Sequence, residues 1–278
     1  MENQKPKFKA IVLDLFDTLV TWDPARLPIL QWNGREIHST IPWILPRLES
    51  ALGAKYSRDE FITTYTKVYE EINVEREREG IEITCHERFV RTLARLGVNG
   101  IEQRLIAEEL TRIHMKGVRE ATSAPPARVA AVRRLAEKHR LGLLSNFDDS
   151  KTGWEIMADT GVQDRFEAII ISADLAIRKP NPKIFQRMLE MLNLLAEEVL
   201  FVGDAPHDDV VGAKSVGMSA AWIHRPLTSA NRGHQLFSAA ADQVHGASAN
   251  ADLSIFDGLA KPDYLIEDLA ELPDILDP

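Results

Sequence analysis

Two hydrophobic patterns divide the chain. Short continuous apolar runs, typical of strands buried on both faces of a parallel sheet, occur near the N-terminus and again beyond residue 140. The predicted strands cover residues 11–15, 141–144, 168–172, 199–202, 219–223 and 264–266. From about residue 125 they alternate with helical periodicity at 129–139, 152–161, 182–194 and 209–216. This alternation predicts an α/β fold with a doubly wound parallel sheet.

A second pattern occupies roughly residues 21–120. Apolar positions there recur at helical spacing, as in Phe61, Tyr65 and Val68, and the predicted helices cover 43–52, 58–79, 85–96 and 102–120. We therefore expect a core of residues 1–20 and 121–278, interrupted after its first strand by an all-helical domain of residues 21–120. The segment from Trp22 to Trp43, rich in tryptophan and proline, is interpreted as turns and packing of that domain in preference to a specificity wall.

A further segment, residues 227–260, interrupts the last two predicted strands. It is rich in alanine, serine, asparagine and glycine, with only short apolar patches. Long connections without secondary structure are uncommon inside compact domains. We expect this segment to be a surface excursion from the core.

Polar side chains follow several of the predicted strands. Asp14 lies at the end of the first strand, Ser145 and Asn146 come after the second, and Asp204 after the fourth, while Lys179 follows the loop after the third. In an open parallel sheet the carboxyl ends of the strands line one crevice, and ligands bind there. Carboxylates, a hydroxyl and an amine in one crevice suit a Mg²⁺-assisted site for a phosphoryl group.

Each of these motifs, taken alone, also has a structural interpretation. Asp17 and Thr18 could begin a turn, and Ser145 could cap the next helix. Lys179-Pro180 could be a surface lysine beside helix-starting prolines, and Asp208 or Asp209 could cap the helix after Asp204. The strongest single motif is the run from Gly203 to Asp209, in which three carboxylates follow a strand.

The overall composition restricts the kinds of molecule that the protein is expected to bind. The chain has 278 residues, of which 45% are hydrophobic and 27% charged, as is ordinary for a globular protein. A net charge of −9 disfavours nucleic acid, and no apolar run approaches the roughly 18 residues that a membrane span needs. The single cysteine, Cys85, and an N-terminus without a signal-peptide core fit the cytoplasm. We expect a cytoplasmic protein acting on a small molecule, and make no prediction of its oligomeric state.

Together the four motifs resemble the haloacid dehalogenase-like hydrolase superfamily, in the branch with a helical cap. The resemblance covers residues 8–19, about 125–226 and 264–276. It implies a Rossmann-like core, a helical cap after the first strand, Mg²⁺ as cofactor and an aspartyl-phosphate intermediate. By this resemblance Asp14 is the nucleophile, and Asp14, Asp204 and the Phe16 carbonyl hold the metal with support from Asp209. Ser145 and Lys179 are implied to hold the transferring group. Asn146 and Phe16 are implied to contact the substrate.

The sequence departs from the family's phosphatases at Phe16. Phosphatases usually carry there an aspartate that protonates the leaving group, a role worth about 10²–10⁴-fold in rate. An aromatic at this position also resembles the 2-haloacid dehalogenases, which however lack the acidic motif found here at Asp204–Asp209. We rank three hypotheses: a Mg²⁺-dependent phosphohydrolase first, a 2-haloacid dehalogenase second, and third a catalytically weak member that binds a metabolite or a protein.

Overall fold

The computed structural model describes residues 7–53, 56–224 and 253–277, which form two compact units. Residues 7–21, 123–224 and 253–277 make the core unit, and residues 22–53 and 56–122 make the helical unit. Most of the surface excursion predicted at 227–260 lies outside the described residues. Its end is a short 3₁₀ helix, Leu253–Phe256, whose Phe256 is buried in the core unit.

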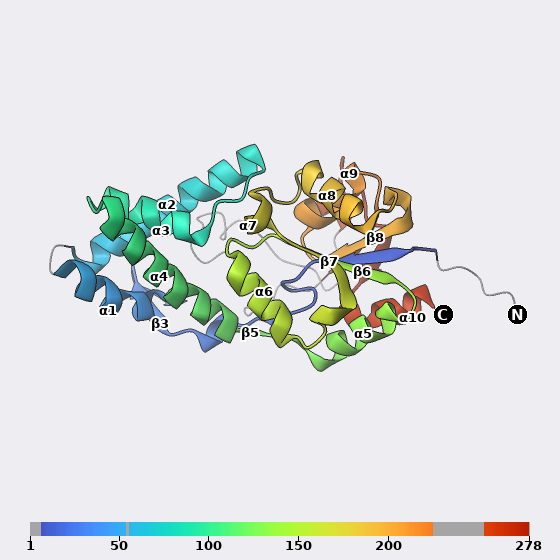
Figure 1. Cartoon of the computed structure of the whole chain (residues 1–278), viewed down its shortest axis with the longest axis horizontal. Coiled ribbons are helices and arrows are strands. Elements are labelled where there is room, and N and C mark those ends of the chain that lie inside the picture. The colour runs from blue at the N-terminus through green and yellow to red at the C-terminus, as the bar shows by residue number, and fades with distance from the viewer. Residues whose placement is uncertain (1–6, 54–55, 225–252, 278) are drawn as a thin grey trace, which may run out of the picture. The chain divides into compact units, whose positions relative to one another are not determined.

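The core unit is built on a six-stranded sheet in which every pair of neighbours is parallel (Figure 1). Its strands, in spatial order, are β10 (Tyr264–Ile266), β9 (Ser219–Ile223), β8 (Val199–Gly203), β1 (Ala10–Leu13), β6 (Arg140–Ser145) and β7 (Phe166–Ile171). The chain runs outward from β1 in both directions, so a topological switch point lies at the carboxyl end of β1. The predicted doubly wound parallel α/β fold is confirmed.

Helices cover the sheet on both faces. Over one face lie α8 (Pro182–Leu192) and α9 (Gly212–Ser215), whose apolar side chains pack on β1, β8 and β9. On the other face α5 (Pro126–Ala136) packs on β6 and on α10 (Leu272–Leu276). The remaining core helices are α6 (Ser150–Asp159) and α7 (Ser172–Leu175).

Gly142 of β6 lies where a side chain would crowd its neighbours. Gly142 pairs with Val12, and a Cβ at Gly142 would lie 2.9 Å from the sulfur of Met188 and 3.1 Å from a methyl of Val12. The glycine therefore lets α8 approach the sheet closely. The apolar runs of β1, β6 and β8 are almost wholly buried, as expected for strands covered on both faces.

The helical unit holds four longer helices. They are α1 (Ile41–Leu52), α2 (Arg58–Glu79), α3 (Cys85–Arg95) and α4 (Gly100–Glu120). The hydroxyl of Ser57 accepts a hydrogen bond from Glu60 N at the start of α2, and Gly80 ends that helix in the left-handed conformation. Phe61, Tyr65 and Val68 of α2 are buried, as their helical spacing predicts.

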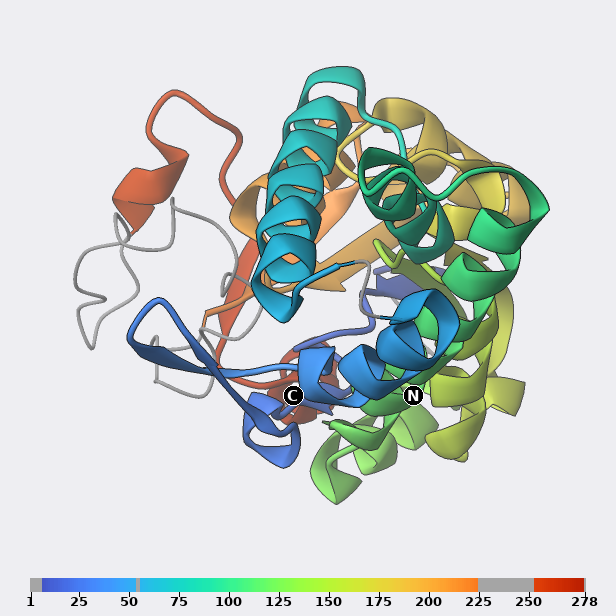
Figure 2. The same cartoon turned by 90° about the vertical axis from the view of Figure 1, so that its left-hand side faces the viewer.

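The helical unit also contains a β-hairpin, so the prediction of helices alone was wrong for residues 29–38. Strands β3 (Ile29–Trp32) and β4 (Arg35–His38) pair antiparallel (Figure 2, dark blue). Their two-residue turn, Asn33-Gly34, has positive φ at both positions, which is the conformation this dipeptide favours in hairpins. Two further short strands, β2 (Thr21–Trp22) and β5 (Thr122–Ser123), pair where the chain passes between the units.

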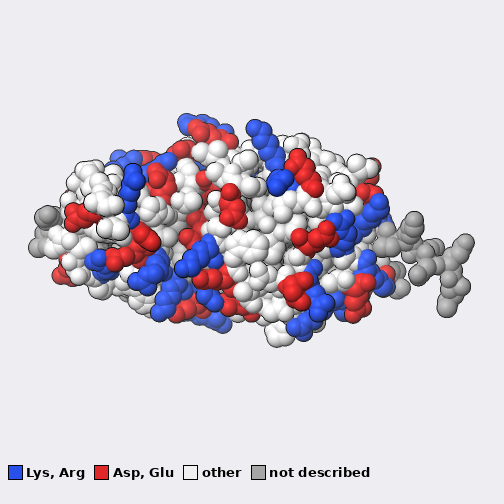
Figure 3. Space-filling view, in the orientation of Figure 1, with Lys and Arg blue, Asp and Glu red and all other residues white. Residues whose placement is uncertain are grey.

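The described surface carries charges of both signs. In Figure 3 acidic and basic side chains are interspersed over the face shown. Exposed ion pairs also occur, such as Arg134 with Asp274, whose charged atoms are 2.6 Å apart. Within the described residues, no helix combines the length and the apolar character needed to cross a membrane.

Candidate active site

The site lies at the carboxyl ends of three adjacent strands. Asp14 follows β1, Ser145 is the last residue of β6, and Asp204 follows β8. The amide of Asp14 donates to the carbonyl of Val202 at 2.9 Å, which continues the parallel pairing of β1 with β8 by one residue. The sheet register therefore brings these polar groups to one edge, as the sequence predicted.

Lys179 is the centre of an ion cluster. Its Nζ donates to Asp14 Oδ1 and to Asp209 Oδ1, both at 2.6 Å, and the side chain is 2% exposed. The ammonium also lies 5.3 Å from the centre of the Phe201 ring in β8. An ammonium held between two carboxylates has a fixed position, from which it can also meet an anionic substrate oxygen.

Asp204 completes a group of three carboxylates. Oxygens of Asp14, Asp204 and Asp209 all lie within 4.8 Å of one another. Asp209 is held by the amide of Ala205, which donates to its Oδ2 at 2.9 Å, and a Cβ at Gly203 would lie 2.1 Å from that oxygen. Gly203 is thus required for the close approach of Asp209, which belongs to a π-helical turn, Pro206–Val211.

The cluster shifts the acidities of its members. Burial, together with the charge of Asp209, raises the pKa of Asp14 to about 7 although Lys179 acts in the opposite direction. Burial and the charges of Asp209, Asp14 and Asp17 raise the pKa of Asp204 well above its ordinary range, and burial raises the pKa of Asp209. Burial alone would lower the pKa of Lys179, but Asp14 and Asp209 raise it above its ordinary value.

The balance of charge adds to the effect of burial. Three carboxylates, of which Asp14 and Asp209 are buried and Asp204 is half-buried, lie close to one ammonium, so full ionisation leaves two negative charges uncompensated. A divalent cation would supply the missing charge, and carboxylate oxygens are the ligands that Mg²⁺ prefers. The donor set of Asp14, Asp204 and Asp209 therefore fits Mg²⁺.

The hydroxyl of Ser145 is buried beside this cluster and has no hydrogen-bond partner among the described residues. A buried hydroxyl without a partner is costly, since it has given up its hydrogen bonds to water. Its position at the end of β6 suits a hydroxyl that donates to an oxygen of a bound substrate.

The side-chain amide of Asn146 is fully engaged within the protein. Its Oδ1 accepts from Lys179 N at 2.8 Å, and its Nδ2 donates to Lys179 O at 3.0 Å and to Asp208 Oδ2 at 3.1 Å. Arg178 Nη2 lies 3.9 Å from the same oxygen of Asp208. Asp208, which the sequence suggested as a helix cap, contacts Asn146, and its side chain remains 32% exposed. No local pattern could reveal this contact, which joins residues 62 positions apart.

Phe16 lies in an aromatic pair. Its ring centre is 5.0 Å from that of Phe147, at an angle of 45° between the rings, and the residue is 9% exposed. The next residue, Asp17, has a φ of 56°, a left-handed conformation that aspartate tolerates better than most residues. The charge of Asp17 contributes to the raised pKa of Asp204.

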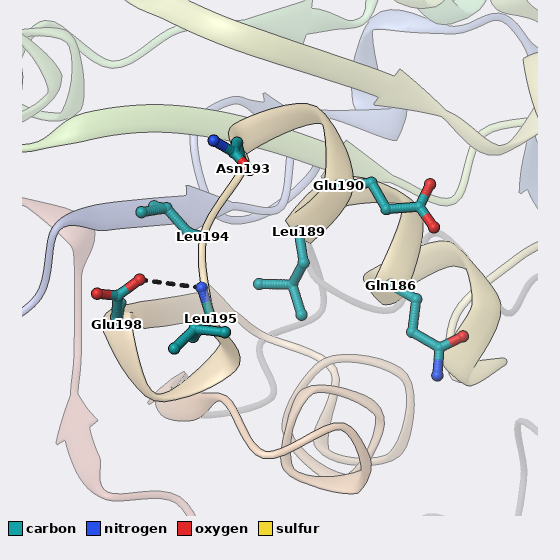
Figure 4. Close-up of a pocket in the computed structure, with 7 residues that line it drawn as sticks. All are labelled: Gln186, Leu189, Glu190, Asn193, Leu194, Leu195 and Glu198. Carbon is teal, nitrogen blue, oxygen red and sulfur yellow. Dashed lines mark hydrogen bonds between the residues drawn. The ribbon is translucent and has the colours of Figure 1, made fainter.

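The structure also has a hollow far from this chemistry. It has a volume of about 440 Å³ and lies between α8 and the loop before β8, at the amino-terminal edge of the sheet (Figure 4). Leu189 and Leu195 point into it, and Glu198 is turned to the amide of Leu195. The strand-end carboxylates, rather than this hollow, provide the functional groups expected of an active site.

Comparison with known sequences gives a consistent family. The family model described as haloacid dehalogenase-like hydrolase matches residues 8–217, and a model of HAD-hydrolase-like proteins matches 176–272. The chain is 39% identical over 99 residues to a glyceraldehyde 3-phosphate phosphatase of Pyrococcus abyssi, covering 36% of this chain and 41% of that protein. It is 36% identical over 73 residues to a phosphoserine phosphatase of Thermus thermophilus, covering 26% and 29%. The matches thus span about two fifths or less of these relatives.

Solved structures share the fold. A 2-haloacid dehalogenase from Pseudomonas syringae superposes with a TM-score of 0.62 at 22% identity, covering 97% of this chain and 98% of that one. A HAD phosphatase from Thermococcus onnurineus superposes with a TM-score of 0.58 at 24% identity, with the same coverage. Because dehalogenase and phosphatase are almost equally similar, the fold does not choose between their activities.

Proposed function

We propose that this chain, which belongs to the haloacid dehalogenase-like hydrolase family, is a Mg²⁺-dependent phosphohydrolase acting on a small phosphorylated molecule. The observation that carries the proposal is the excess of carboxylate beside the strand ends, where Asp14 and Asp209 hold Lys179 and Asp204 lies close to both carboxylates. A dehalogenase releasing halide from an uncharged carbon centre has no evident need for such an excess. The phosphatase relatives point to the same class of reaction.

In the proposed reaction Asp14 is the nucleophile. A carboxylate oxygen of Asp14 forms a bond to phosphorus, and the bond from phosphorus to the leaving oxygen breaks with its electron pair. Lys179 Nζ and the free hydroxyl of Ser145 stabilise charge on the phosphoryl oxygens. Water then attacks phosphorus and passes a proton to solvent, while the bond from phosphorus to the Asp14 oxygen breaks with its electron pair, which releases phosphate and the Asp14 carboxylate.

The metal site would consist of Asp14, Asp204 and the backbone carbonyl of Phe16, with Asp209 in support. When bound, Mg²⁺ supplies positive charge that draws the phosphoryl oxygens toward the nucleophile. Asp209 then has two tasks, since it also holds Lys179. The helical unit, inserted after β1 and Val20, would act as the cap that selects the substrate.

Phe16 limits which leaving groups the proposed reaction can release. A phenylalanine packed against Phe147 cannot donate a proton to a departing alkoxide. We therefore propose a substrate whose leaving group is a weak base, such as an aryl or acyl phosphate. Alkyl phosphates like those in the names of the phosphatase relatives would need a proton from another group.

The second candidate function is hydrolysis of 2-haloacids, which the aromatic Phe16 favours. The sequence Ser145-Asn146 also favours it. Both N–H groups of the Asn146 amide are already donated within the protein, so that amide has none left for a halide. The third candidate, a weak or inactive binding member, keeps the metal site but predicts no turnover.

A release assay separates the three candidates. The protein is incubated with p-nitrophenyl phosphate, acetyl phosphate, alkyl phosphates and 2-chloropropionate, each with Mg²⁺ and with EDTA. Phosphate release that requires Mg²⁺ and vanishes in Asp14→Asn supports the proposal. Halide release that survives EDTA would replace it with the dehalogenase. Metal binding without release of either product would support the third candidate.

A further inference from the structure

We infer that Asn146 and Asp208 form a clamp that positions Lys179, and that Asn146 is a positioning residue instead of a substrate-binding one. The clamp is defined by three hydrogen bonds: Lys179 N to Asn146 Oδ1, Asn146 Nδ2 to Lys179 O, and Asn146 Nδ2 to Asp208 Oδ2. It ties together the loops that follow β6, β7 and β8, although none of these loops is adjacent to another in the sequence.

The two bonds to Lys179 fix its backbone. The Asn146 amide pairs with the N–H and the C=O of one residue, at 2.8 and 3.0 Å, as a neighbouring strand would. No regular strand pairing holds Lys179, which lies between α7 and α8. The amide of Asn146 therefore supplies the hydrogen bonds that regular secondary structure does not.

The contact with Asp208 fixes the orientation of the amide. Exchanging Oδ1 and Nδ2 of Asn146 would place N–H against the N–H of Lys179 and oxygen against two other oxygens. Only the observed orientation satisfies all three bonds. Asp208 favours it further because a carboxylate is a stronger acceptor than a neutral group.

The chemistry of Lys179 explains why such a clamp matters. Its ammonium must reach Asp14 and Asp209 at 2.6 Å through a flexible four-carbon stem. With the backbone fixed at one end and the two carboxylates at the other, the ammonium has little freedom left. A displacement of about 1 Å at a catalytic group can cost as much as 10²-fold in rate.

The activity test rests on the proposed phosphohydrolase function and uses the full chain, Mg²⁺ and p-nitrophenyl phosphate. Asn146→Ala should lower kcat by about 10–100-fold with KM within about threefold, because substrate contacts remain. Asp208→Ala should lower kcat by a smaller factor, and Asp208→Asn, which keeps an acceptor oxygen, should return it to within about twofold of the wild type. A raised KM with kcat retained in Asn146→Ala would mean that Asn146 contacts substrate, and the clamp would be rejected.

A matched control comes from the same loop. Asp149 caps α6, its Oδ1 accepting from Thr152 N at 2.9 Å. Asp149→Ala removes a side chain of similar size that forms no part of the clamp, so it should weaken the helix cap but keep kcat. A loss of kcat equal to that of Asn146→Ala would show that any disturbance of this loop suffices, which overturns the inference.

A second readout does not depend on activity. The amide of Lys179, protected by Asn146 Oδ1, should exchange its hydrogen at least about tenfold faster in Asn146→Ala. Asp208→Ala, at a partly exposed position that tolerates change, should give a smaller acceleration. If the wild type hydrolyses no phosphate ester, the proposed function fails while this measurement still judges the clamp. Unchanged exchange in both variants would overturn it.

Discussion

Each unit of the protein contains a group of buried charged side chains, and the two groups differ in the ratio of positive to negative charges. In the helical unit Arg76 Nη2 lies 2.9 Å from Glu82 Oε1, with both residues buried, and the same guanidinium donates to the carbonyl of Ile83. In the core unit Lys179 faces Asp14, Asp209 and the nearby Asp204. One positive charge is matched by one carboxylate in the first group and outnumbered in the second.

This difference separates a structural ion pair from a reactive one. A matched pair with additional backbone hydrogen bonds satisfies its members and leaves nothing for a ligand. An unmatched cluster keeps its carboxylates at raised pKa, as in Asp14, and is stabilised when a cation arrives. The predictions below test this comparison in order of decreasing effect.

The largest expected effect is that of Asp14→Asn on turnover. The amide is a poor nucleophile, so phosphate release should fall by roughly 10³-fold or more. Without metal the variant should be at least as stable as the wild type at pH 8, since one repelling charge is gone. Chemical denaturation in EDTA measures this. Near-normal turnover would make Asp14 a structural residue.

Removing the carboxylate charge from the buried ion pair of the helical unit should lower stability and leave turnover unchanged. Glu82→Gln leaves Arg76 buried without its counter-ion, which should lower the free energy of unfolding by about 3 kcal/mol. The folded variant should keep its kcat. A control is Glu79→Gln at the exposed pair with Arg78, where solvent screens the charges and the free energy of unfolding should stay close to that of the wild type. A large loss of kcat in Glu82→Gln, with the fold retained, would contradict the structural assignment of this pair.

Phe16→Asp should change the dependence on the leaving group. In the wild type the rate should fall steeply from aryl or acyl phosphates to alkyl phosphates, because no acid protonates an alkoxide. The substitution should raise alkyl phosphate hydrolysis by about 10–100-fold if the new carboxylate reaches the leaving oxygen. The measurement is the rate against leaving-group pKa for both proteins. A flat wild-type slope would show that another group already donates the proton.

The smallest effect is on the pH dependence of stability. The pKa of Asp14 is about 7 in the folded protein against an ordinary 3.8, so between these values the folded state binds the extra proton. The free energy of unfolding in EDTA should therefore be highest below pH 4 as far as this group is concerned, and fall as pH rises to about 7. The pKa of about 7 already includes the opposing effect of Lys179, so the loss corresponds to the whole shift from 3.8.

Mg²⁺ should remove this loss, because its ligands must be deprotonated to bind. The rise in Tm on adding Mg²⁺ should thus be larger at pH 8 than at pH 5. Equal shifts at both pH values would mean that the carboxylate cluster is not where the ion binds.

The sequence allowed those site residues to be predicted that come directly after a predicted strand. β1, β6 and β8 were readable as apolar runs, and Asp14, Ser145 and Asp204 follow from them because parallel strands end at one edge. The helices of the second unit were readable from their period. The hairpin at Asn33-Gly34 was missed although its turn dipeptide was visible, because the segment of residues 22–43, rich in tryptophan and proline, was interpreted as turns and packing.

Other features could not have been read from the sequence. The bonds from Asn146 to Lys179 and Asp208 depend on the paths of three loops, which no local pattern encodes. The raised pKa of Asp14 is a consequence of burial and of charges brought together by the sheet. The pairing of Phe16 with Phe147 is likewise tertiary, whereas the absence of an acid at residue 16 is plain from the sequence.

The most direct test of the account is a calorimetric titration of Mg²⁺ into the wild type, Asp204→Asn and Asp208→Asn. The account predicts that the wild type binds one ion, that Asp204→Asn weakens binding by about tenfold or more, and that Asp208→Asn stays within about twofold. A wild type that binds no Mg²⁺, or a greater loss in Asp208→Asn than in Asp204→Asn, would contradict the claim that the strand-end carboxylates are a metal site.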